Sequence, residues 1–168
     1  LAALEGGKYG IAFSSGMASA DSCMKLLRQG DHVVCCDDVY GGTARLFNNL
    51  MTNYGVEFTY VDSQVAENVQ KAIRPETKMV WVETPTNPLL KVTDLEAVGN
   101  IAKSNDLLYV VDTTFATPVF LRPLEYGADL VLHSTTKYLS GHNQIIGGAV
   151  ITDRDDLYDQ LKYIQKSV

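Results

Sequence analysis

Four short apolar runs of this sequence each end in polar residues whose side chains can bind ligands or move protons. Each run and its polar end are 32–36 with 37–42, 79–82 with 83–88, 107–111 with 112–114, and 130–133 with 134–137. In a parallel sheet the carboxyl ends of the strands lie along one edge, and such sheets bind ligands there. We therefore predict that these scattered polar groups form one site.

Lys137 directly follows the last of these runs, between Thr136 and Tyr138. A lysine at the rim of a dry cleft can lose its proton and form an imine with an aldehyde cofactor. For an isolated lysine, a solvated surface charge would be the better interpretation. The position of Lys137 on the ligand-binding edge favours the imine.

Asp112 ends a strongly apolar run, where a carboxylate is costly unless it has a partner. A protonated pyridine nitrogen is such a partner, and a ring kept in this state can store electrons during a reaction. A helix N-cap or a purely structural aspartate explains the residue equally well. Asp112 is thus a candidate cofactor ligand with a structural alternative.

The segment Ser15-Gly16-Met17 precedes a predicted helix and can form an anion site. Free N–H groups at a helix start attract anions, and Gly16 allows a close approach. Ser134 and Thr136 could add hydroxyl groups to the same anion. The later glycines of a P-loop or a dinucleotide fingerprint are missing, and an ordinary serine N-cap is at least as good an explanation.

Two further residues of the predicted edge suit a flat aromatic ligand. Tyr40 follows the first run and could stack on a ring, with core packing as the alternative. Asn87 could donate to a phenolate oxygen, although asparagine before proline is also a common turn residue.

Strand-like and helix-like segments alternate throughout the chain. We predict strands at 32–36, 56–61, 79–82, 107–111, 130–133 and 147–152, and helices at 17–29, 43–53, 66–73, 94–104 and 155–165. The apolar runs do not alternate with polar residues, which is typical of strands covered on both faces. This order predicts an α/β domain with a mostly parallel sheet and helices on both faces.

The composition excludes several classes of partner. The net charge is −6 without a cluster of basic residues, which argues against nucleic acid and anionic membranes. We find no apolar stretch of about 18 residues and no signal peptide, so we expect no membrane span. Cys23, Cys35 and Cys36 lack the spacing of a disulfide framework or a metal site, which predicts reduced thiols in a cytoplasmic protein without a bound metal.

Three motifs together resemble one family, the Cys/Met-metabolism enzymes that depend on pyridoxal phosphate. Asp129–His142 (DLVLHSTTKYLSGH) is similar to the lysine signature of the family at essentially every restricted position. Asp37–Thr43 (DDVYGGT) and Glu83–Pro88 (ETPTNP) match as well, in the same order and at the same spacing. The resemblance covers nearly the whole chain.

The resemblance implies the large domain of fold type I, the aspartate-aminotransferase-like fold, with pyridoxal 5'-phosphate as the cofactor. It also implies a homotetramer of dimers with shared active sites. By motif match, Lys137 is the cofactor lysine, Asp112 the partner of the ring nitrogen, and Tyr40 the stacking tyrosine that assists proton transfer. The remaining implied contacts are Ser15, Gly16, Met17, Ser134 and Thr136 with the phosphate, Asn87 near the ring hydroxyl, and Arg45 in the substrate cleft.

Residues 1–168 would then be the central part of the cofactor-binding domain. The upstream Tyr-x-Arg motif and the carboxyl-terminal domain of the family are not found in this sequence. Thr113 stands where the family usually has Asn, and Gln144 where an acidic residue is common. These two departures affect only fine positioning.

The implied reaction is γ-elimination on a sulfur amino acid of the cystathionine γ-lyase type, giving cysteine, 2-oxobutanoate and ammonia. The γ-replacement of cystathionine γ-synthase and the reaction of cystathionine β-lyase remain open. Gly42 stands where methionine γ-lyases usually carry Cys, which argues mildly against that branch. A nucleotide-binding module is an alternative of another class, but the sequence lacks the glycine fingerprint of such a module. A non-catalytic structural subunit is a further alternative, and the presence of Lys137, Asp112 and Tyr40 argues against it.

Overall fold

The computed structural model describes residues 1–167 as alternating strands and helices. The strands are β1 (Tyr9–Phe13), β2 (His32–Cys36), β3 (Glu57–Val61), β4 (Thr77–Glu83), β5 (Leu108–Asp112), β6 (Leu130–Ser134) and β7 (Gly148–Thr152). The α-helices are α1 (Ala2–Glu5), α2 (Gly16–Met24), α3 (Gly41–Arg45), α4 (Ala66–Ala72), α5 (Leu95–Ser104), α6 (Thr117–Phe120) and α7 (Asp155–Ser167). The shorter helical turns are the π-helix η1 (Leu46–Leu50) and the 3-10 helices η2 (Met51–Tyr54) and η3 (Pro123–Tyr126).

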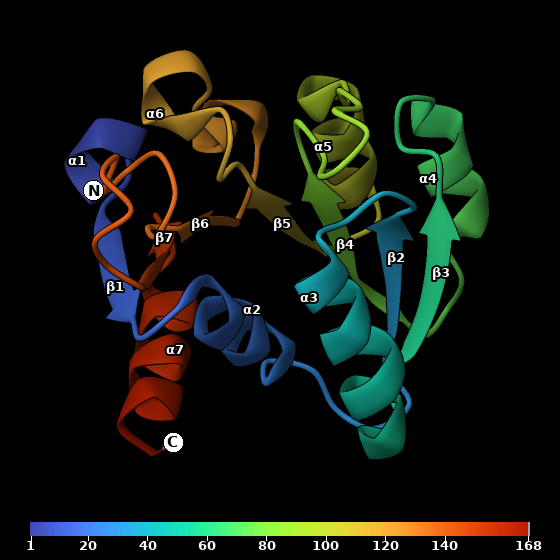
Figure 1. Cartoon of the computed structure of the whole chain (residues 1–168). Helices are drawn as coiled ribbons and strands as arrows, with labels where there is room; N and C mark the ends of the chain where they lie inside the picture. Colours follow the sequence, from blue (N-terminus) through green and yellow to red (C-terminus); the bar gives the residue numbers. More distant parts are fainter. Residues whose placement is uncertain (168) are drawn as a thin grey trace.

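The strands form one sheet in the order β1-β7-β6-β5-β4-β2-β3 (Figure 1). The run from β3 to β6 is parallel, whereas β7 pairs antiparallel with β6, and β1 antiparallel with β7. The predicted α/β class with a mostly parallel sheet is therefore confirmed. The carboxyl ends of the parallel strands β2, β4, β5 and β6 lie along one edge, as predicted.

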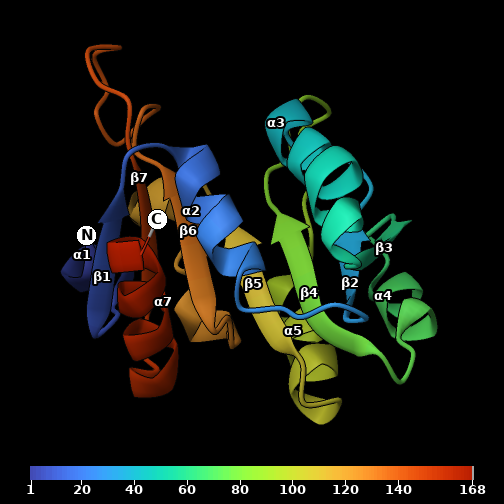
Figure 2. The ribbon, with the colours of Figure 1, turned by 90° about the horizontal axis from the view of Figure 1, so that it is seen from below.

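Helices cover both faces of this sheet, as expected. Figures 1 and 2 show α2, α3 and α7 on one face and α1, α4, α5 and α6 on the other. The two faces bury separate apolar clusters, one with Phe47 and Trp81 at its centre and one with Val98 and Tyr109. Strands between two such layers are buried on both sides, which explains their continuous apolar runs.

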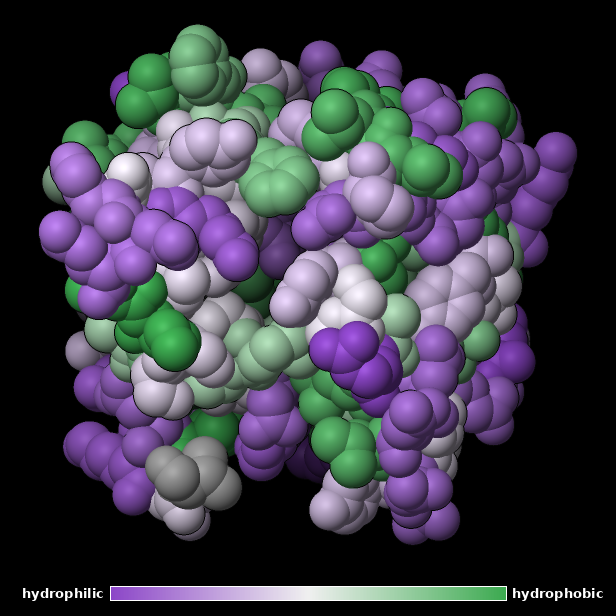
Figure 3. Space-filling model, in the orientation of Figure 1, coloured by the Kyte–Doolittle hydropathy of each residue, from purple (hydrophilic) through white to green (hydrophobic). Residues whose placement is uncertain are grey.

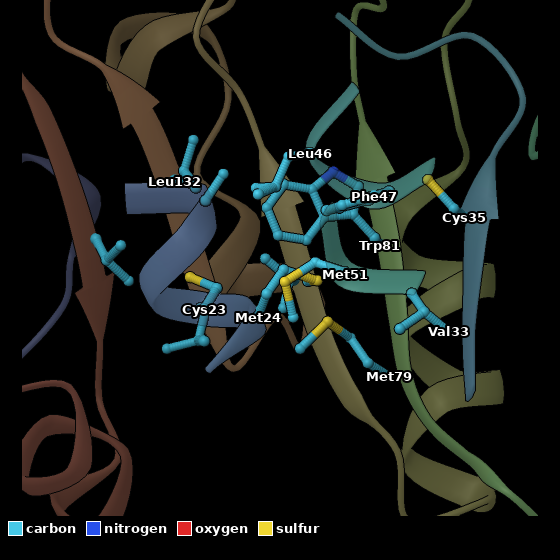
Figure 4. Packing of buried hydrophobic residues seen from close by; sticks show 14 of the residues in the cluster. Cys23, Met24, Val33, Cys35, Leu46, Phe47, Met51, Met79, Trp81 and Leu132 are labelled. Carbon is cyan, nitrogen blue, oxygen red and sulfur yellow. The ribbon is translucent and has the colours of Figure 1, made fainter. Parts of the chain in front are cut away.

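Aromatic and sulfur-containing side chains pack among the aliphatic ones in the first cluster (Figure 4). The ring of Phe47 meets Trp81 edge-on, with their centroids 5.2 Å apart, and stacks on Phe58 at 4.7 Å. Met24 from α2 and Met79 from β4 lie below this group in Figure 4. Close packing of this kind leaves little freedom, so it holds α2 and the segment after α3 firmly against the sheet.

The structure adds two elements that were not predicted and changes the bounds of two predicted helices. The strand β1 and the helix α6 were not predicted; β1 is a short edge strand weakened by Gly10, and α6 is a single turn. The predicted helix 43–53 is divided into α3, η1 and η2 and ends at Gly55, whose φ of 78° stops it. The predicted helix 17–29 ends at Met24.

The structure of residues 1–167 also bears on membrane spans, metal clusters and disulfides. Among residues 1–167 no helix is long and apolar enough to cross a membrane. The same residues contain no cluster of three or more side chains able to hold a metal ion. The three cysteines are buried and free of disulfides.

Candidate active site

A cavity of about 360 Å³ opens at the carboxyl edge of the sheet. The face drawn in Figure 3 is hollowed near its centre, above α2 in the view of Figure 1. All of the predicted cofactor contacts line this cavity, namely Ser15, Gly16, Met17, Tyr40, Asn87, Asp112, Ser134, Thr136 and Lys137. The structure thus brings together residues from five separate segments of the chain.

Glycines allow the start of α2 to lie against the end of β6. A Cβ atom on Gly16 would lie 2.7 Å from Cβ of Ser134, and one on Gly148 would lie 2.1 Å from the carbonyl oxygen of Ser15. The hydroxyl of Ser15 accepts the N–H of Ala18 at 3.0 Å, so the side chain acts as an N-cap. The N-cap alternative is therefore right for the hydroxyl of Ser15. The backbone at the start of α2 and the side chain of Ser134 remain as a candidate anion site, which we call the anion cradle.

Asp112 ends β5 with a buried side chain that is 8% exposed. Its Oδ1 accepts the hydroxyl of Thr114 at 2.6 Å and the N–H of Thr114 at 3.0 Å. The Thr114 hydroxyl in turn accepts the N–H of Ser134 at 2.9 Å, which ties the ends of β5 and β6 together. Burial raises the pKa of Asp112, because the hydrogen bonds from Thr114 only partly offset the loss of solvent. A cationic partner in the cavity would stabilise this carboxylate.

Glu83 is a second buried carboxyl in the cavity wall, and its role was not predicted from the sequence. It pairs with Asp112 in the register of β4 and β5. Burial, followed by the negative charge of Asp112, raises the pKa of Glu83 to about 8. The signal that could have found it is its position at the end of β4, which matches that of Asp112 at the end of β5.

Tyr40 lies between β2 and α3, and its side chain is 43% exposed. The alternative of core packing is therefore wrong for this ring. A Cβ atom on Gly42 would lie 2.4 Å from the ring and 2.8 Å from the sulfur of Met17. Because Gly42 has no side chain, the ring of Tyr40 can lie against it on the cavity wall.

Lys137 stands on the turn that follows β6, where its N–H donates to the carbonyl of Ser134 at 3.3 Å. Its side chain is exposed and lines the cavity, and within the described residues no carboxylate forms an ion pair with its amine. The hydroxyl of Thr136 is already engaged, because it donates to the carbonyl of Gly147 at 3.2 Å and accepts its N–H at 3.0 Å.

Arg45 is the one predicted site residue that does not line the cavity. It is exposed at the end of α3 and borders a neighbouring hollow together with Met17, Gly42 and Leu50. Tyr40 precedes α3 as its N-cap, whereas Arg45 is the last residue of the helix. Met17 is the one other candidate that borders this hollow as well as the cavity.

A family model described as "Cys/Met metabolism PLP-dependent enzyme" matches residues 1–168 of this chain. The chain belongs to this family. Its relatives include the cystathionine gamma-lyase of Bacillus subtilis, 52% identical over 164 residues, and the cystathionine beta-lyase of Coxiella burnetii, 50% identical over 170 residues. These alignments cover 98% and 100% of this chain, but only 43% and 44% of the two relatives. The chain thus spans less than half of their length.

Solved structures of the family show the same fold. The crystal structure of metB from Corynebacterium glutamicum is 50% identical, with a TM-score of 0.97 over 99% of this chain and 43% of that chain. The cystathionine gamma-lyase of Lactobacillus plantarum complexed with L-serine is 44% identical, with a TM-score of 0.97 over 99% of this chain and 44% of that chain. The predicted fold of the pyridoxal-phosphate enzymes is confirmed by this likeness.

The cavity fits the cofactor of the family. Pyridoxal phosphate needs an amine for its aldehyde carbon, a carboxylate for its ring nitrogen and hydrogen-bond donors for its phosphate. Within residues 1–167, the lining of the cavity contains one amine, that of Lys137, and the carboxyl group of Asp112. Gly16 lies so close to Ser134 that an added Cβ atom would meet it at 2.7 Å, and both residues line the cavity, where the N–H groups at the start of α2 can bind an anion.

Proposed function

We propose that this chain carries the cofactor-binding centre of an enzyme that cleaves cystathionine by γ-elimination. With one water consumed, the products are cysteine, 2-oxobutanoate and ammonia. The observation that carries the proposal is the single cavity wall shared by Lys137, Asp112 and Tyr40. The name of the Bacillus subtilis relative, cystathionine gamma-lyase, supports this choice of substrate.

The three residues have separate tasks in this proposal. The bound cofactor supplies an electron sink for the carbanion that forms at the substrate. The Lys137 amine binds the cofactor aldehyde at rest and moves protons at Cα and Cβ of the substrate when it is free. The Tyr40 hydroxyl assists this proton transfer while its ring stacks on the cofactor. Asp112 keeps the ring nitrogen protonated.

The remaining cavity residues hold the cofactor in place. We assign the phosphate to the start of α2, at Ser15, Gly16 and Met17, and to the end of β6, at Ser134 and Thr136. Asn87 stands near the ring hydroxyl in this assignment. Arg45, which borders the neighbouring hollow, is our candidate for a contact in the substrate cleft.

We also propose a context for the chain in the whole enzyme. It forms the central part of the large domain of a longer subunit, since it aligns with 43% to 52% of its relatives. The subunits form a homotetramer of dimers with shared active sites in the cytoplasm. The three free, buried thiols support a reducing compartment.

Two neighbouring reactions are the alternatives. Relatives of nearly the same identity are named cystathionine beta-lyase, at 50%, and cystathionine gamma-synthase, at 48%. The residues of this cavity serve all three reactions, so the leaving group and the acceptor distinguish them.

Product analysis of the full-length enzyme tests the proposal. Incubation with cystathionine is expected to release cysteine and 2-oxobutanoate. Release of homocysteine and pyruvate would show β-elimination instead. Cystathionine formed from an O-acylhomoserine and cysteine, without cleavage of cystathionine, would show γ-replacement, and either result would contradict γ-elimination.

A further inference from the structure

Two backbone segments that carry cofactor contacts meet at one carboxyl group. Oε2 of Glu83 accepts the N–H of Tyr40 at 2.8 Å, and Oε1 accepts the N–H of Asn87 at 2.8 Å. Tyr40 precedes Glu83 by 43 residues, whereas Asn87 follows it by four. Glu83 therefore joins the segment after β2 to the loop after β4.

A second carboxyl group joins the same two segments in the opposite direction. Asp38, two residues before Tyr40, accepts the N–H of Leu89 at 2.9 Å and the hydroxyl of Thr86. Each segment thus offers a carboxyl group to the other. This reciprocal pair leaves the loop after β4 little freedom relative to Tyr40.

The backbone of Glu83 is held by Cys36 at the end of β2. The backbone N–H of Glu83 donates to the sulfur of Cys36 at 3.2 Å, and the Cys36 thiol donates to the carbonyl of Asp38 at 3.7 Å. The side chain of Glu83 is only 5% exposed. Burying a carboxyl beside another carboxyl is unfavourable, so its two backbone contacts must offset this cost.

We propose that Glu83 is a positioning residue of the cavity, which fixes Tyr40 and Asn87 relative to each other so that both meet the cofactor ring. The inference rests on the proposed function, because that proposal gives Tyr40 and Asn87 their contacts. Glu83 acts through the backbone of these two residues. Glu83 therefore positions other residues and does not itself contact the cofactor or the substrate.

The protonation of Glu83 agrees with this task. Burial and the charge of Asp112 raise the pKa of Glu83 to about 8, so the carboxyl is largely neutral at pH 7. A protonated carboxyl keeps lone pairs that can accept both N–H groups. A neutral Glu83 adds no second negative charge beside Asp112, which the proposed function pairs with the ring nitrogen.

Three variants of the full-length enzyme test the inference. Glu83→Ala removes both contacts and leaves two N–H groups without acceptors, while Glu83→Gln keeps only one acceptor oxygen. Glu96→Gln is the control, because Glu96 is exposed on α5 away from the cavity. Each cofactor-free protein is titrated with pyridoxal phosphate, and the visible circular dichroism of the bound cofactor and the thermal midpoint are recorded.

We expect the dissociation constant for the cofactor to rise about 10-fold or more in Glu83→Ala. The loss of one hydrogen bond changes a free energy by about the amount that corresponds to a tenfold change in a dissociation constant. The circular dichroism band should weaken, because the ring is no longer held in one orientation. Glu83→Gln should lie between Glu83→Ala and the wild type, and Glu96→Gln should match the wild type. If Glu83→Ala does not fold, the shift in Glu83→Gln decides the question.

The possible failures are distinguishable. A wild-type enzyme that binds no pyridoxal phosphate would overturn the proposed function and the inference with it. A wild type that binds the cofactor, with wild-type affinity and circular dichroism in the Glu83 variants that fold, would overturn the inference alone. A lower thermal midpoint with an unchanged cofactor band would also overturn it, because Glu83 would then be only a structural residue.

Discussion

At the residue scale, the site depends on two carboxyl groups that end neighbouring strands. Asp112 and Glu83 face each other across β5 and β4, and burial raises the pKa of both. Their surroundings differ, because Asp112 is held by Thr114 and Glu83 by the N–H groups of Tyr40 and Asn87. We therefore propose a different role for each carboxyl group, with Asp112 holding the ring nitrogen and Glu83 positioning Tyr40 and Asn87.

Replacing Asp112 by Asn tests the first task. The Asp112→Asn enzyme should bind pyridoxal phosphate but turn over about 10²- to 10³-fold more slowly, because an amide cannot keep the ring nitrogen protonated. Steady-state kinetics and the cofactor absorbance measure the two effects. Near-normal turnover would mean that Asp112 has only a structural role.

The raised pKa of Glu83 predicts how stability depends on pH in the cofactor-free enzyme. The ordinary value is 4.5 and the folded value about 8, so between these values the folded protein holds a proton that the unfolded chain has lost. This contribution to stability is complete below about pH 4.5 and is lost as the pH rises through about 8. Asp112, also raised, acts with the same sign.

Thermal unfolding of the cofactor-free wild type and of Glu83→Gln at pH 5 and pH 8 measures this dependence. The wild type should lose more of its midpoint between the two values than the variant, by about 2 °C or more. Parallel pH profiles would show that Glu83 keeps no extra proton in the folded state.

The sequence could identify some of these residues but not others. Lys137, Asp112 and Tyr40 were found because strand ends in a parallel sheet converge, and the structure places all three on one cavity wall. Glu83 and Thr114 were missed because their tasks depend on hydrogen bonds between strands, which spacing does not reveal. Arg45 was assigned to the substrate cleft by motif match alone; it borders the neighbouring hollow, and its contact with substrate stays a prediction.

At the scale of elements, close backbone approach shapes the anion cradle. The start of α2 reaches the end of β6 only because Gly16 has no side chain. The sequence predicted a helix here but not its end, because Leu26 and Leu27 continue the apolar pattern and pack against the core although the helix ends at Met24. It also missed β1, whose pairing with β7 gives the short strand its stability.

Gly16→Ala tests this approach. The added Cβ atom would lie 2.7 Å from Ser134, so α2 or β6 must shift, at a cost of about 1–3 kcal/mol in folding free energy. We expect a lower thermal midpoint and weaker cofactor binding. Gly10→Ala is the matched control, since its Cβ atom would meet Ala2 at an ordinary 3.6 Å. Equal cofactor affinity in both variants would contradict the cradle at the start of α2.

At the scale of the whole molecule, the cradle lacks a cation of its own. Among residues 1–167, Lys137 is the only basic residue that lines the cavity, and the proposal assigns it to the aldehyde. A helix start can hold a phosphate, but an arginine would hold it better through two hydrogen bonds. The proposed shared site supplies that arginine from the Tyr-x-Arg motif of a neighbouring subunit.

Mixing two inactive enzymes tests the sharing. One carries Lys137→Ala, and the other lacks the arginine of the Tyr-x-Arg motif. Mixed oligomers of a shared-site enzyme contain some fully intact sites, so part of the activity should return after subunit exchange. Confirmed exchange without recovered activity would mean that each subunit completes its own site.

Attachment of the cofactor to Lys137 is the central claim, and one chemical measurement tests it most directly. Borohydride reduction of the full-length enzyme with bound pyridoxal phosphate makes the bond to the lysine permanent, and peptide mapping then locates it. The account predicts the label on the peptide that contains Lys137. A label on any other lysine, with Lys137 unmodified, would contradict it.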